Sequence, residues 1–386
     1  MKKVLERIGI FFIWFYLICS ILFNAIFITF KIDQPQDFGS FIQAGLYAAV
    51  GENPYRSDGD LLFRVVIDAV GLDVVNPNLN PPISVNIFEW IAQLGSAQML
   101  SMACRLLSIV LYLVGILFLE KNYQTQKGKI RLVWALSLAG FWHTIELGQI
   151  YIPLVLLLCF AWVYMTQKKV VIAGILLGLL LAIKPNFFLL VLIILTGGYF
   201  RLAITSIITF AAVSILPLFR YGPEIYSQWL IASAAYDGYA LPNNDSFVGL
   251  MVRFQHPEWG TWLSIALMTF LLILAWRKRI DPQLLWGFGV TASLLCSPIA
   301  WGGYTLFFLP YFYSRKDWLF AEKIAAALFT IVFIIPVYLF QLSFVNYILF
   351  GWTYGWGILL ILFSQIKRAW KEPTLPAFSF LKQNKI

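Results

Sequence analysis

Charged residues are scarce in this chain. They make up only 12% of its 386 residues, whereas soluble domains average about 25%. Hydrophobic residues make up 60% of the chain, and many apolar runs approach the roughly 20 residues that cross a bilayer as a helix. This composition excludes an ordinary soluble enzyme and predicts an all-α polytopic integral membrane protein. We expect about 10–13 transmembrane or re-entrant helices in a single membrane domain over residues 1–386.

Residues that bind metals or cofactors are also few. The chain has two histidines and four cysteines, and the cysteines lie in or near apolar runs without metal-ligand spacing, which favours buried packing. No Walker A, Rossmann, zinc or GxSxG motif occurs. We therefore expect no metal, no cofactor and no nucleotide-driven chemistry. A substrate delivered by the membrane itself fits these absences.

Basic residues outnumber acidic ones and give a net charge of +9. They lie mostly in short loops between apolar runs, which is typical of topology signals and not of nucleic-acid binding. Lys2, Lys3 and Arg7 predict a cytoplasmic N-terminus, followed by a retained first helix over residues 8–30. The short basic tail over 370–386 is predicted to be cytoplasmic too. We expect a bacterial plasma-membrane location and no nucleic-acid partner.

The first predicted outer loop covers residues 31–82 and is mainly acidic. After Asp37, apolar residues recur at helical spacing: Phe38, Phe41, Ile42, Leu46 and Ala49. They predict a short amphipathic helix in the membrane interface, with Asp37 as its N-cap and an end at Gly51. Asp37 has two possible roles, as a helix cap alone or as a carboxylate held at the membrane surface to act as a general base.

An intramembrane lysine marks the run over residues 170–200. Two full crossings would need about 40 residues, so this shorter run predicts a broken or re-entrant pair of helices around Lys184 and Pro185. Lys184 lies roughly 22 Å along a helix from Lys169, which predicts a position in the outer half of the membrane, facing a cavity. Snorkelling to the interface is the alternative to a functional role, such as neutralising a lipid phosphate.

Further candidates lie in two other segments. Glu146 and Gln149, in "HTIELGQIY", are suited to orienting a sugar hydroxyl, although hydrogen bonding between helices is an alternative. The second predicted outer loop, over 220–258, contains Arg220 and Arg253, whose guanidinium groups are suited to gripping phosphate oxygens.

Two other motifs favour structural roles. "PNNDSF", over residues 242–247, is typical of an Asx turn. "SPIAWGGY", over 297–304, is typical of a rigid turn that leads into a span.

Several short motifs together resemble one enzyme family. In chain order they are Asp37, G-x-x-P-Y at 51–55, N-P-P at 80–82, G-Q at 148–149, I-K-P at 183–185 and S-P-x-x-W at 297–301. In this order they resemble glycosyltransferase family 87 of the GT-C superfamily. The resemblance implies an inverting transferase that moves one sugar, typically mannose, from a polyprenyl-phosphate donor to an acceptor hydroxyl outside the cytoplasm. It also implies a membrane-parallel helix that holds the catalytic base, here Asp37.

The resulting site hypothesis assigns three groups of residues. Asp37 is the base. The donor phosphate is expected to meet Lys184, Arg253 and Arg220. The sugar or acceptor is expected to meet Gln149, Glu146, Tyr304, Asn80 and Tyr55. Relatives commonly carry a histidine shortly after the S-P-x-x-W tryptophan, whereas this chain has Gly302, Gly303 and Tyr304, so Tyr304 is the candidate replacement.

The expected partners are the polyprenyl-phosphate sugar, a lipid or glycan acceptor and the surrounding membrane lipids. Two other functions share some of these features. A secondary transporter or lipid flippase also has broken helices and an intramembrane lysine, but long asymmetric outer loops and the missing inverted repeat count against it. An O-antigen polymerase or ligase also uses polyprenyl-linked glycans. Release of polyprenyl phosphate without net solute movement separates the transferase from the transporter, and movement of single sugars separates it from the ligase.

Overall fold

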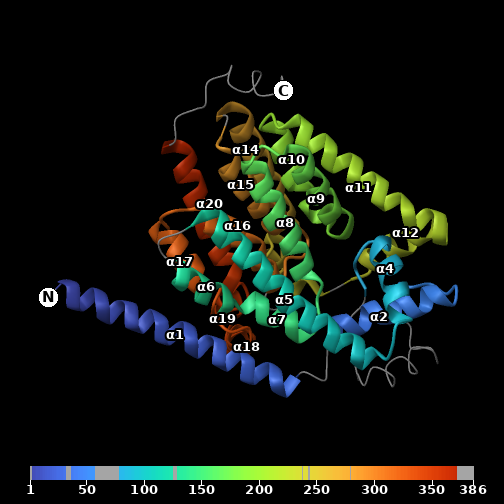
Figure 1. Cartoon of the computed structure of the whole chain (residues 1–386), viewed down its shortest axis with the longest axis horizontal. Coiled ribbons are helices and arrows are strands. Elements are labelled where there is room, and N and C mark those ends of the chain that lie inside the picture. Colours follow the sequence, from blue (N-terminus) through green and yellow to red (C-terminus); the bar gives the residue numbers. More distant parts are fainter. Residues whose placement is uncertain are drawn as a thin grey trace.

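The chain folds almost entirely into helices. The computed structural model describes residues 2–31, 36–56, 78–124, 128–236, 238–241, 244–278 and 280–371, and no strand forms within these ranges (Figure 1). The all-α prediction is therefore confirmed. Residues 57–77 of the first predicted outer loop and 372–386 of the predicted tail lie outside the described residues.

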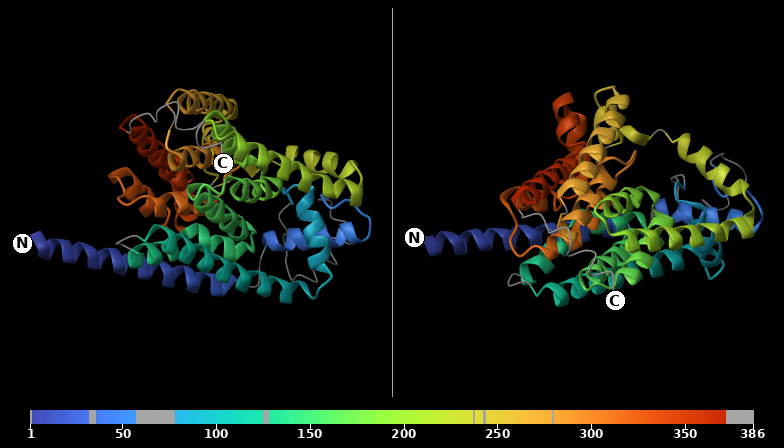
Figure 2. Two further views of the ribbon diagram at one scale, coloured as in Figure 1. Left: turned by 45° about the horizontal axis from the view of Figure 1, so that its top comes forward. Right: turned by 90° about the horizontal axis from the view of Figure 1, so that it is seen from above.

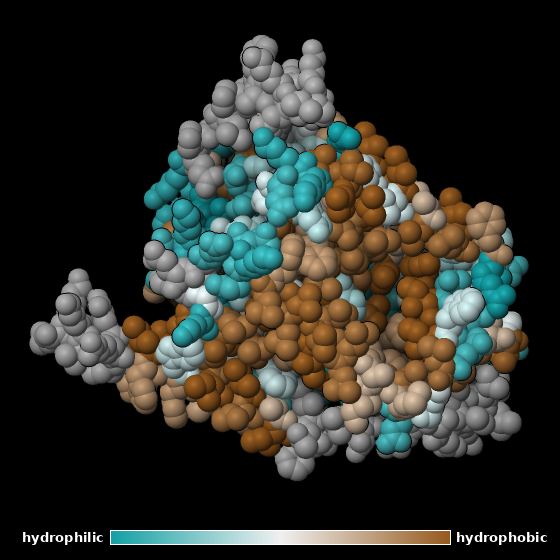
Figure 3. Space-filling model, viewed as in Figure 1, coloured by the Kyte–Doolittle hydropathy of each residue, from teal (hydrophilic) through white to brown (hydrophobic). Residues whose placement is uncertain are grey.

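Among the residues that the structure describes, three helices are long and apolar enough to cross a membrane: α5 (Ala97–Tyr123), α11 (Phe200–Tyr221) and α14 (Pro257–Lys278). Each carries large apolar side chains on the surface, such as Leu106, Ile208 and Trp262, which are more than half exposed. Shorter apolar segments lie in α1 (Lys2–Lys31), α8 (Tyr151–Thr166), α9 (Val170–Ile183) and α10 (Phe188–Thr196). Figure 3 shows a broad apolar belt with polar patches at upper left and at the right edge. This surface is typical of a polytopic membrane protein.

The chain breaks at Lys184, as the sequence predicts. α9 ends at Ile183, and a single 3₁₀ turn, η1 (Pro185–Phe187), leads into α10. A side chain at Gly174 would contact Thr205 of α11, and one at Gly178 would contact Thr209. Since the residue numbers of these contacts rise together in α9 and α11, the two helices run in the same direction. The connecting helix α10 must therefore run in the opposite direction. The prediction of a broken pair of short helices is confirmed.

This register also gives the depth of Lys184. Extended from the Gly174–Thr205 and Gly178–Thr209 contacts, it places Lys184 level with about residue 215 of α11. The end of α11 at Tyr221 is therefore farther along the same direction, by roughly 9 Å at ~1.5 Å per residue. Lys184 thus lies below the end of the spanning helix, at the turn between α9 and α10.

The apolar run over residues 132–145 predicts one span, but the chain there forms the end of α6 (Gly128–Leu136) and most of α7 (Ala139–Leu147). At the break, the Ala139 N–H donates to the Phe329 carbonyl at 2.9 Å. A tertiary partner therefore takes the donor that would have continued the helix.

The last third of the chain is similarly broken into short pieces. They are α15 (Pro282–Leu295), η3 (Gly302–Phe308), α16 (Leu309–Ser314), α17 (Phe320–Leu328), α18 (Ile334–Leu339), η4 (Phe340–Leu342), α19 (Phe344–Leu349) and α20 (Thr353–Lys371).

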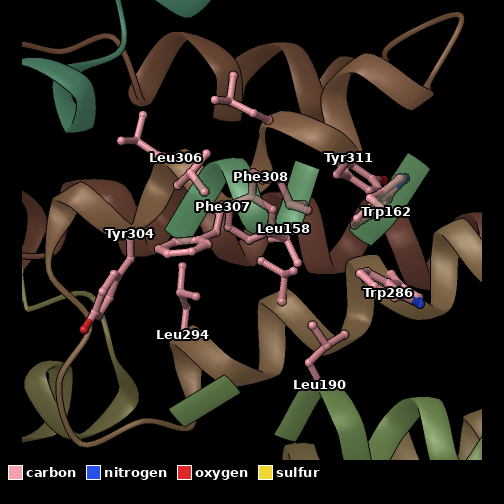
Figure 4. Packing of buried hydrophobic residues seen from close by; sticks show 14 of the residues in the cluster. Leu158, Trp162, Leu190, Trp286, Leu294, Tyr304, Leu306, Phe307, Phe308 and Tyr311 are labelled. Carbon is pink, nitrogen blue, oxygen red and sulfur yellow. The ribbon is translucent and has the colours of Figure 1, made fainter. Parts of the chain in front are cut away.

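The main apolar core surrounds α15, of which nearly every residue is buried. Trp286 of α15 packs edge-on against Trp162 of α8, with ring centroids 5.8 Å apart. Phe307 of η3 packs against Phe187 of η1 at 4.5 Å. Figure 4 shows these rings meeting from several elements, with Tyr304 at one margin and its hydroxyl pointing away from the cluster. Tyr304 therefore lies at the boundary between the apolar core and a more polar region.

A separate group of helices lies at one end of the molecule. α2 (Gln36–Ala49), α4 (Pro82–Ala92) and α12 (Glu224–Ala234) lie together, far from the start of α1 in both views of Figure 2. Phe38 and Phe41 of α2 are each 1% exposed and contact Phe88 of α4. The apolar face of α2, which the sequence predicts to lie in the membrane interface, is thus covered by protein. α2 ends at Ala49, before Gly51 with φ +80°, as predicted.

Two small helical elements complete the second predicted outer loop. They are η2 (Gly238–Ala240) and α13 (Phe247–Val252).

Candidate active site

Asp37 lies in the first turn of α2, after Gln36, which is the first helical residue. It is therefore the second residue of the helix and not the N-cap that the sequence predicts. The partial positive charge of a helix N-terminus stabilises a carboxylate placed there. The Asp37 side chain is 8% exposed, and its Oδ2 accepts a hydrogen bond from Gln149 Nε2 at 2.7 Å. This contact joins the first predicted outer loop to the turn between α7 and α8.

The α7–α8 turn has its shape because of Gly148. This residue adopts φ +68°, a left-handed conformation that favours glycine, and it ends α7. The Gln149 N–H then donates to the Thr144 carbonyl at 3.0 Å. The tight turn directs the Gln149 side chain toward Asp37 and starts α8 at Tyr151. The G-Q motif is therefore explained by this turn, in which Gly148 adopts the left-handed conformation and Gln149 bonds to Asp37.

Lys184 reaches the same turn from the break between α9 and α10. Its Nζ lies 5.1 Å from the centre of the Tyr151 ring and 5.6 Å from that of Tyr304. An ammonium within ~6 Å of a ring centre is attracted by its π face. No ion pair with a described carboxylate is found for Lys184. Two aromatic rings thus hold the cation beside the residues that contact Asp37.

Tyr304 is positioned by two interlocked loops. Asn244 Nδ2 donates to the Pro298 carbonyl at 3.3 Å, and the Ala300 N–H donates to Asn244 Oδ1 at 3.0 Å. The Ser246 hydroxyl accepts from the Gly249 N–H and so caps α13. The Asx turn predicted for "PNNDSF" is confirmed for its described residues, because the Ser246 N–H donates to Asn244 Oδ1 at 3.4 Å. "SPIAWGGY" forms a turn but leads into the 3₁₀ helix η3 and not into a long span.

Gly303 brings the second loop close to Tyr151. A side chain at Gly303 would lie 2.7 Å from the Tyr151 ring, so only glycine permits this approach. The Tyr151 and Tyr304 rings then lie 4.7 Å apart. Asp37, Gln149, Lys184 and Tyr304 therefore surround Tyr151, which the sequence reasoning missed. We name these five residues the Tyr151 cluster.

Glu146 lies near this cluster at the end of α7. Its side chain is 8% exposed, and Oε2 is 3.5 Å from His143 Nδ1. Buried Arg105 of α5 donates to the Ile145 and Glu146 carbonyls at 3.1 and 3.2 Å. Sequence reasoning also missed Arg105, although an arginine inside an apolar run is a signal of function or structure. Here Arg105 anchors the end of α7.

Tyr55 and Asn80 lie at the other end of α2. The Tyr55 hydroxyl donates to the Asn80 carbonyl at 2.8 Å, and the Asn80 N–H donates to Asn78 Oδ1 at 3.0 Å. Tyr55 packs in a small apolar cluster with Ala48 and Ile225. No contact that joins either residue to the Tyr151 cluster is seen among the described residues. Their predicted role in substrate binding stays a prediction.

The two predicted phosphate-binding arginines already have partners. Arg220 Nη2 lies 2.6 Å from Glu89 Oε1, and the Tyr221 hydroxyl donates to Glu89 Oε2 at 2.6 Å. Hydrogen bonding from Arg220 lowers the pKa of Glu89, so this carboxylate stays charged. The positive charge of Arg220 is therefore already balanced.

Arg253 lies apart from that pair. It is 2% exposed and donates to the carbonyls of Leu241, Asn244 and Gly249. The contacts of Arg220 and Arg253 do not favour phosphate binding by either residue, and that role stays a prediction.

Comparison with known families gives one match. The family model described as glycosyltransferase family 87 matches residues 78–298, which is more than half of the chain. The chain belongs to glycosyltransferase family 87. No curated protein and no solved structure matches the chain.

Within this family 87 enzyme, the matched region contains Gln149, Tyr151 and Lys184. Asp37 and Tyr304 lie outside it, so their place in the site depends on the contacts described above. Asp37 bonds to Gln149 of the turn that leads to Tyr151, and the Tyr304 ring lies 4.7 Å from the Tyr151 ring.

Metal ligands are not gathered in the described part of this glycosyltransferase. No group of three or more His, Cys, Asp or Glu side chains has a geometry suited to a metal ion there. The charged groups at the Tyr151 cluster are one carboxylate, Asp37, and one ammonium, Lys184. This pair can supply a proton acceptor and a counter-charge for an anion.

Proposed function

We propose that this family 87 glycosyltransferase transfers one sugar, with mannose as the first candidate, from a polyprenyl-phosphate donor to an acceptor hydroxyl. The reaction would take place on the extracytoplasmic side of a bacterial plasma membrane and would invert the anomeric carbon. One observation supports this proposal above the others. Asp37 and Lys184, from segments far apart in sequence, contact two residues of one short turn, Gln149 and Tyr151.

Asp37 is the proposed general base. In an inverting transfer, the acceptor oxygen attacks C1 as the bond from C1 to the phosphate oxygen breaks, and Asp37 takes the hydroxyl proton. The hydrogen bond from Gln149 fixes the orientation of the carboxylate, and its first-turn position lies where a helix N-terminus stabilises negative charge. A short helix packed on α4 is a rigid support for this base.

Lys184 is the proposed counter-charge for the leaving group. Polyprenyl phosphate gains negative charge as the C1–O bond breaks, and a fixed cation in a water-poor site stabilises that charge. The Tyr151 and Tyr304 rings hold the ammonium without neutralising it, unlike the carboxylate partner of Arg220. Lys184 lies at the turn between α9 and α10, below the level of Tyr221, and this position supports a role in binding a lipid headgroup. We therefore assign the phosphate to Lys184 ahead of the two arginines.

Purified enzyme in vesicles with a polyprenyl-phosphate sugar tests this proposal. The intact enzyme should release free polyprenyl phosphate and glycosylate an acceptor, with no net solute movement across the vesicle membrane. Asp37→Asn should insert normally and lose transfer. Turnover close to that of the intact enzyme would remove Asp37 from the mechanism, and solute movement without transfer would favour a transporter.

A further inference from the structure

A hollow lies at the end of α2 that is farther from Asp37. Its volume is about 410 Å³, within the roughly 300–1,000 Å³ of small-molecule sites. The turn that follows α2 forms one wall, and the end of α11 with the start of α12 forms the other. Its polar lining residues are Glu52, Asn53, Arg220, Tyr221, Glu224 and Gln228. We name this hollow the α2–α12 pocket.

The charge of this pocket argues against a phosphate ligand. Arg220 is balanced by Glu89 at 2.6 Å, and Glu52 lies 3.7 Å from Arg56. Glu224 adds a further negative charge to the lining. Without an excess of positive charge, the pocket has no attraction for an anion. Side-chain amides and carboxylates of this kind hydrogen-bond the hydroxyl groups of a neutral ligand.

The length of α2 sets the distance between this pocket and the proposed base. Asp37 lies at the start of α2 and Ala49, which lines the pocket, at its end. These two residues are separated by roughly 18 Å along the helix at ~1.5 Å per residue. One ligand that fills the pocket while presenting a hydroxyl to Asp37 must therefore be longer than one sugar unit.

We infer that the α2–α12 pocket binds a neutral sugar residue of the acceptor glycan, at a distance from the hydroxyl that reacts. This inference rests on the proposed function, because Asp37 defines the reacting end of the acceptor. The α2 helix then acts as a ruler that favours acceptors of several sugar units over a single sugar.

The test measures binding, so it does not depend on turnover. Full-length enzyme in nanodiscs is titrated with neutral manno-oligosaccharides, from disaccharide to pentasaccharide, by saturation-transfer NMR. Ala49→Trp fills the pocket from an exposed helix position, and Gln228→Ala removes a polar group from its wall. Val50→Trp is the matched control, because Val50 is 65% exposed and does not line the pocket.

The expected result is that longer oligosaccharides bind and that Ala49→Trp raises their Kd by about tenfold or more. Gln228→Ala should raise the Kd less, and Val50→Trp should leave it unchanged. Absence of oligosaccharide binding, equal binding by Ala49→Trp and Val50→Trp, or displacement by inorganic phosphate would each overturn the inference.

Asp37→Asn separates this inference from the proposed function. It should retain oligosaccharide binding while losing transfer. Full transfer by Asp37→Asn would defeat the proposed function alone, whereas the binding results above bear on the pocket alone.

Discussion

The hairpin of α8 and α9 carries a lysine beside a tyrosine ring at each of its two ends, but the two ends have different surroundings. At one end Lys169 lies 5.4 Å from the Tyr164 ring, and at the other Lys184 lies 5.1 Å from the Tyr151 ring. Glutamines follow the same pattern, since Gln167 bonds to Asn122 and Gln149 bonds to Asp37. Lys169 is exposed, whereas Lys184 is partly buried and lies near the rings of both Tyr151 and Tyr304. The chemistry therefore comes from the surroundings and not from the pair itself.

This comparison explains why only one end is a candidate site. Exposed cation–π contacts contribute only ~0.5–1 kcal/mol, and water screens their charges. At the buried end the same charge acts in a lower dielectric and so interacts more strongly with an anion. The exposed end, with Lys168 and Lys169, fits a predicted cytoplasmic loop. Its residues provide matched controls for each prediction below.

Removing the base should have the largest effect. Asp37→Asn keeps the shape of the side chain but loses the proton acceptor, so transfer should fall by ~10²–10⁴-fold. Initial rates in vesicles at saturating donor measure this change. Asp281→Asn is the control, because Asp281 caps α15 by accepting from the Gln283 and Leu284 N–H groups and lies outside the Tyr151 cluster. An equal loss in both variants would point to a folding effect.

Removing the cation should come next. Lys184→Met retains length and apolar contact but removes the charge, and kcat/KM for the donor should fall by about 10²-fold. Lys169→Met at the exposed end should leave it unchanged. Donor saturation curves for both variants provide the measurement, and unaltered donor saturation in Lys184→Met would take Lys184 out of the site.

Loss of the orienting hydrogen bond should have a smaller effect. Gln149→Ala removes the donor to Asp37, and a hydrogen bond to a charged group is worth ~1.5–3 kcal/mol, so kcat should fall by roughly tenfold or more. Gln167→Ala removes the corresponding amide at the other end and should have no effect on turnover. If the two variants behave alike, the Gln149–Asp37 contact does not support catalysis.

The smallest effect is expected from one hydroxyl. Tyr304→Phe keeps the ring that faces Lys184 and loses only the oxygen, so transfer should fall by roughly 2–10-fold. Tyr164→Phe, whose ring faces Lys169, is the control. Single-turnover rates compare the two. A loss in Tyr304→Phe as large as that in Lys184→Met would mean that the hydroxyl, and not the ring, carries the interaction.

Sequence patterns predicted much of the fold because they reflect local physics. The break at Lys184 and Pro185 follows from a run that is too short for two crossings, and the end of α2 follows from its glycine. The division of α6 from α7 was not predictable, because the Phe329 carbonyl that accepts from Ala139 lies far along the chain. Local patterns do not contain such tertiary partners.

The candidate site was predictable in part for the same reason. Asp37, Gln149, Lys184 and Tyr304 stand out as polar groups or motifs in apolar surroundings. Tyr151 did not, because a tyrosine at the start of an apolar helix is ordinary. The pairing of Arg220 with Glu89 was also not foreseeable, since 131 residues separate them in the chain. Arg220 was predicted as a phosphate ligand from its guanidinium group alone, and its partner Glu89 is evident only from the fold.

The most direct test is a density map of the enzyme in nanodiscs with a non-hydrolysable polyprenyl-phosphonate sugar bound. It should show the phosphonate oxygens in contact with Lys184 Nζ, with C1 of the sugar facing the Asp37 carboxylate across Tyr151. A donor headgroup held by Arg220 or Arg253, with Lys184 or Asp37 on a different side of the protein, would contradict the account.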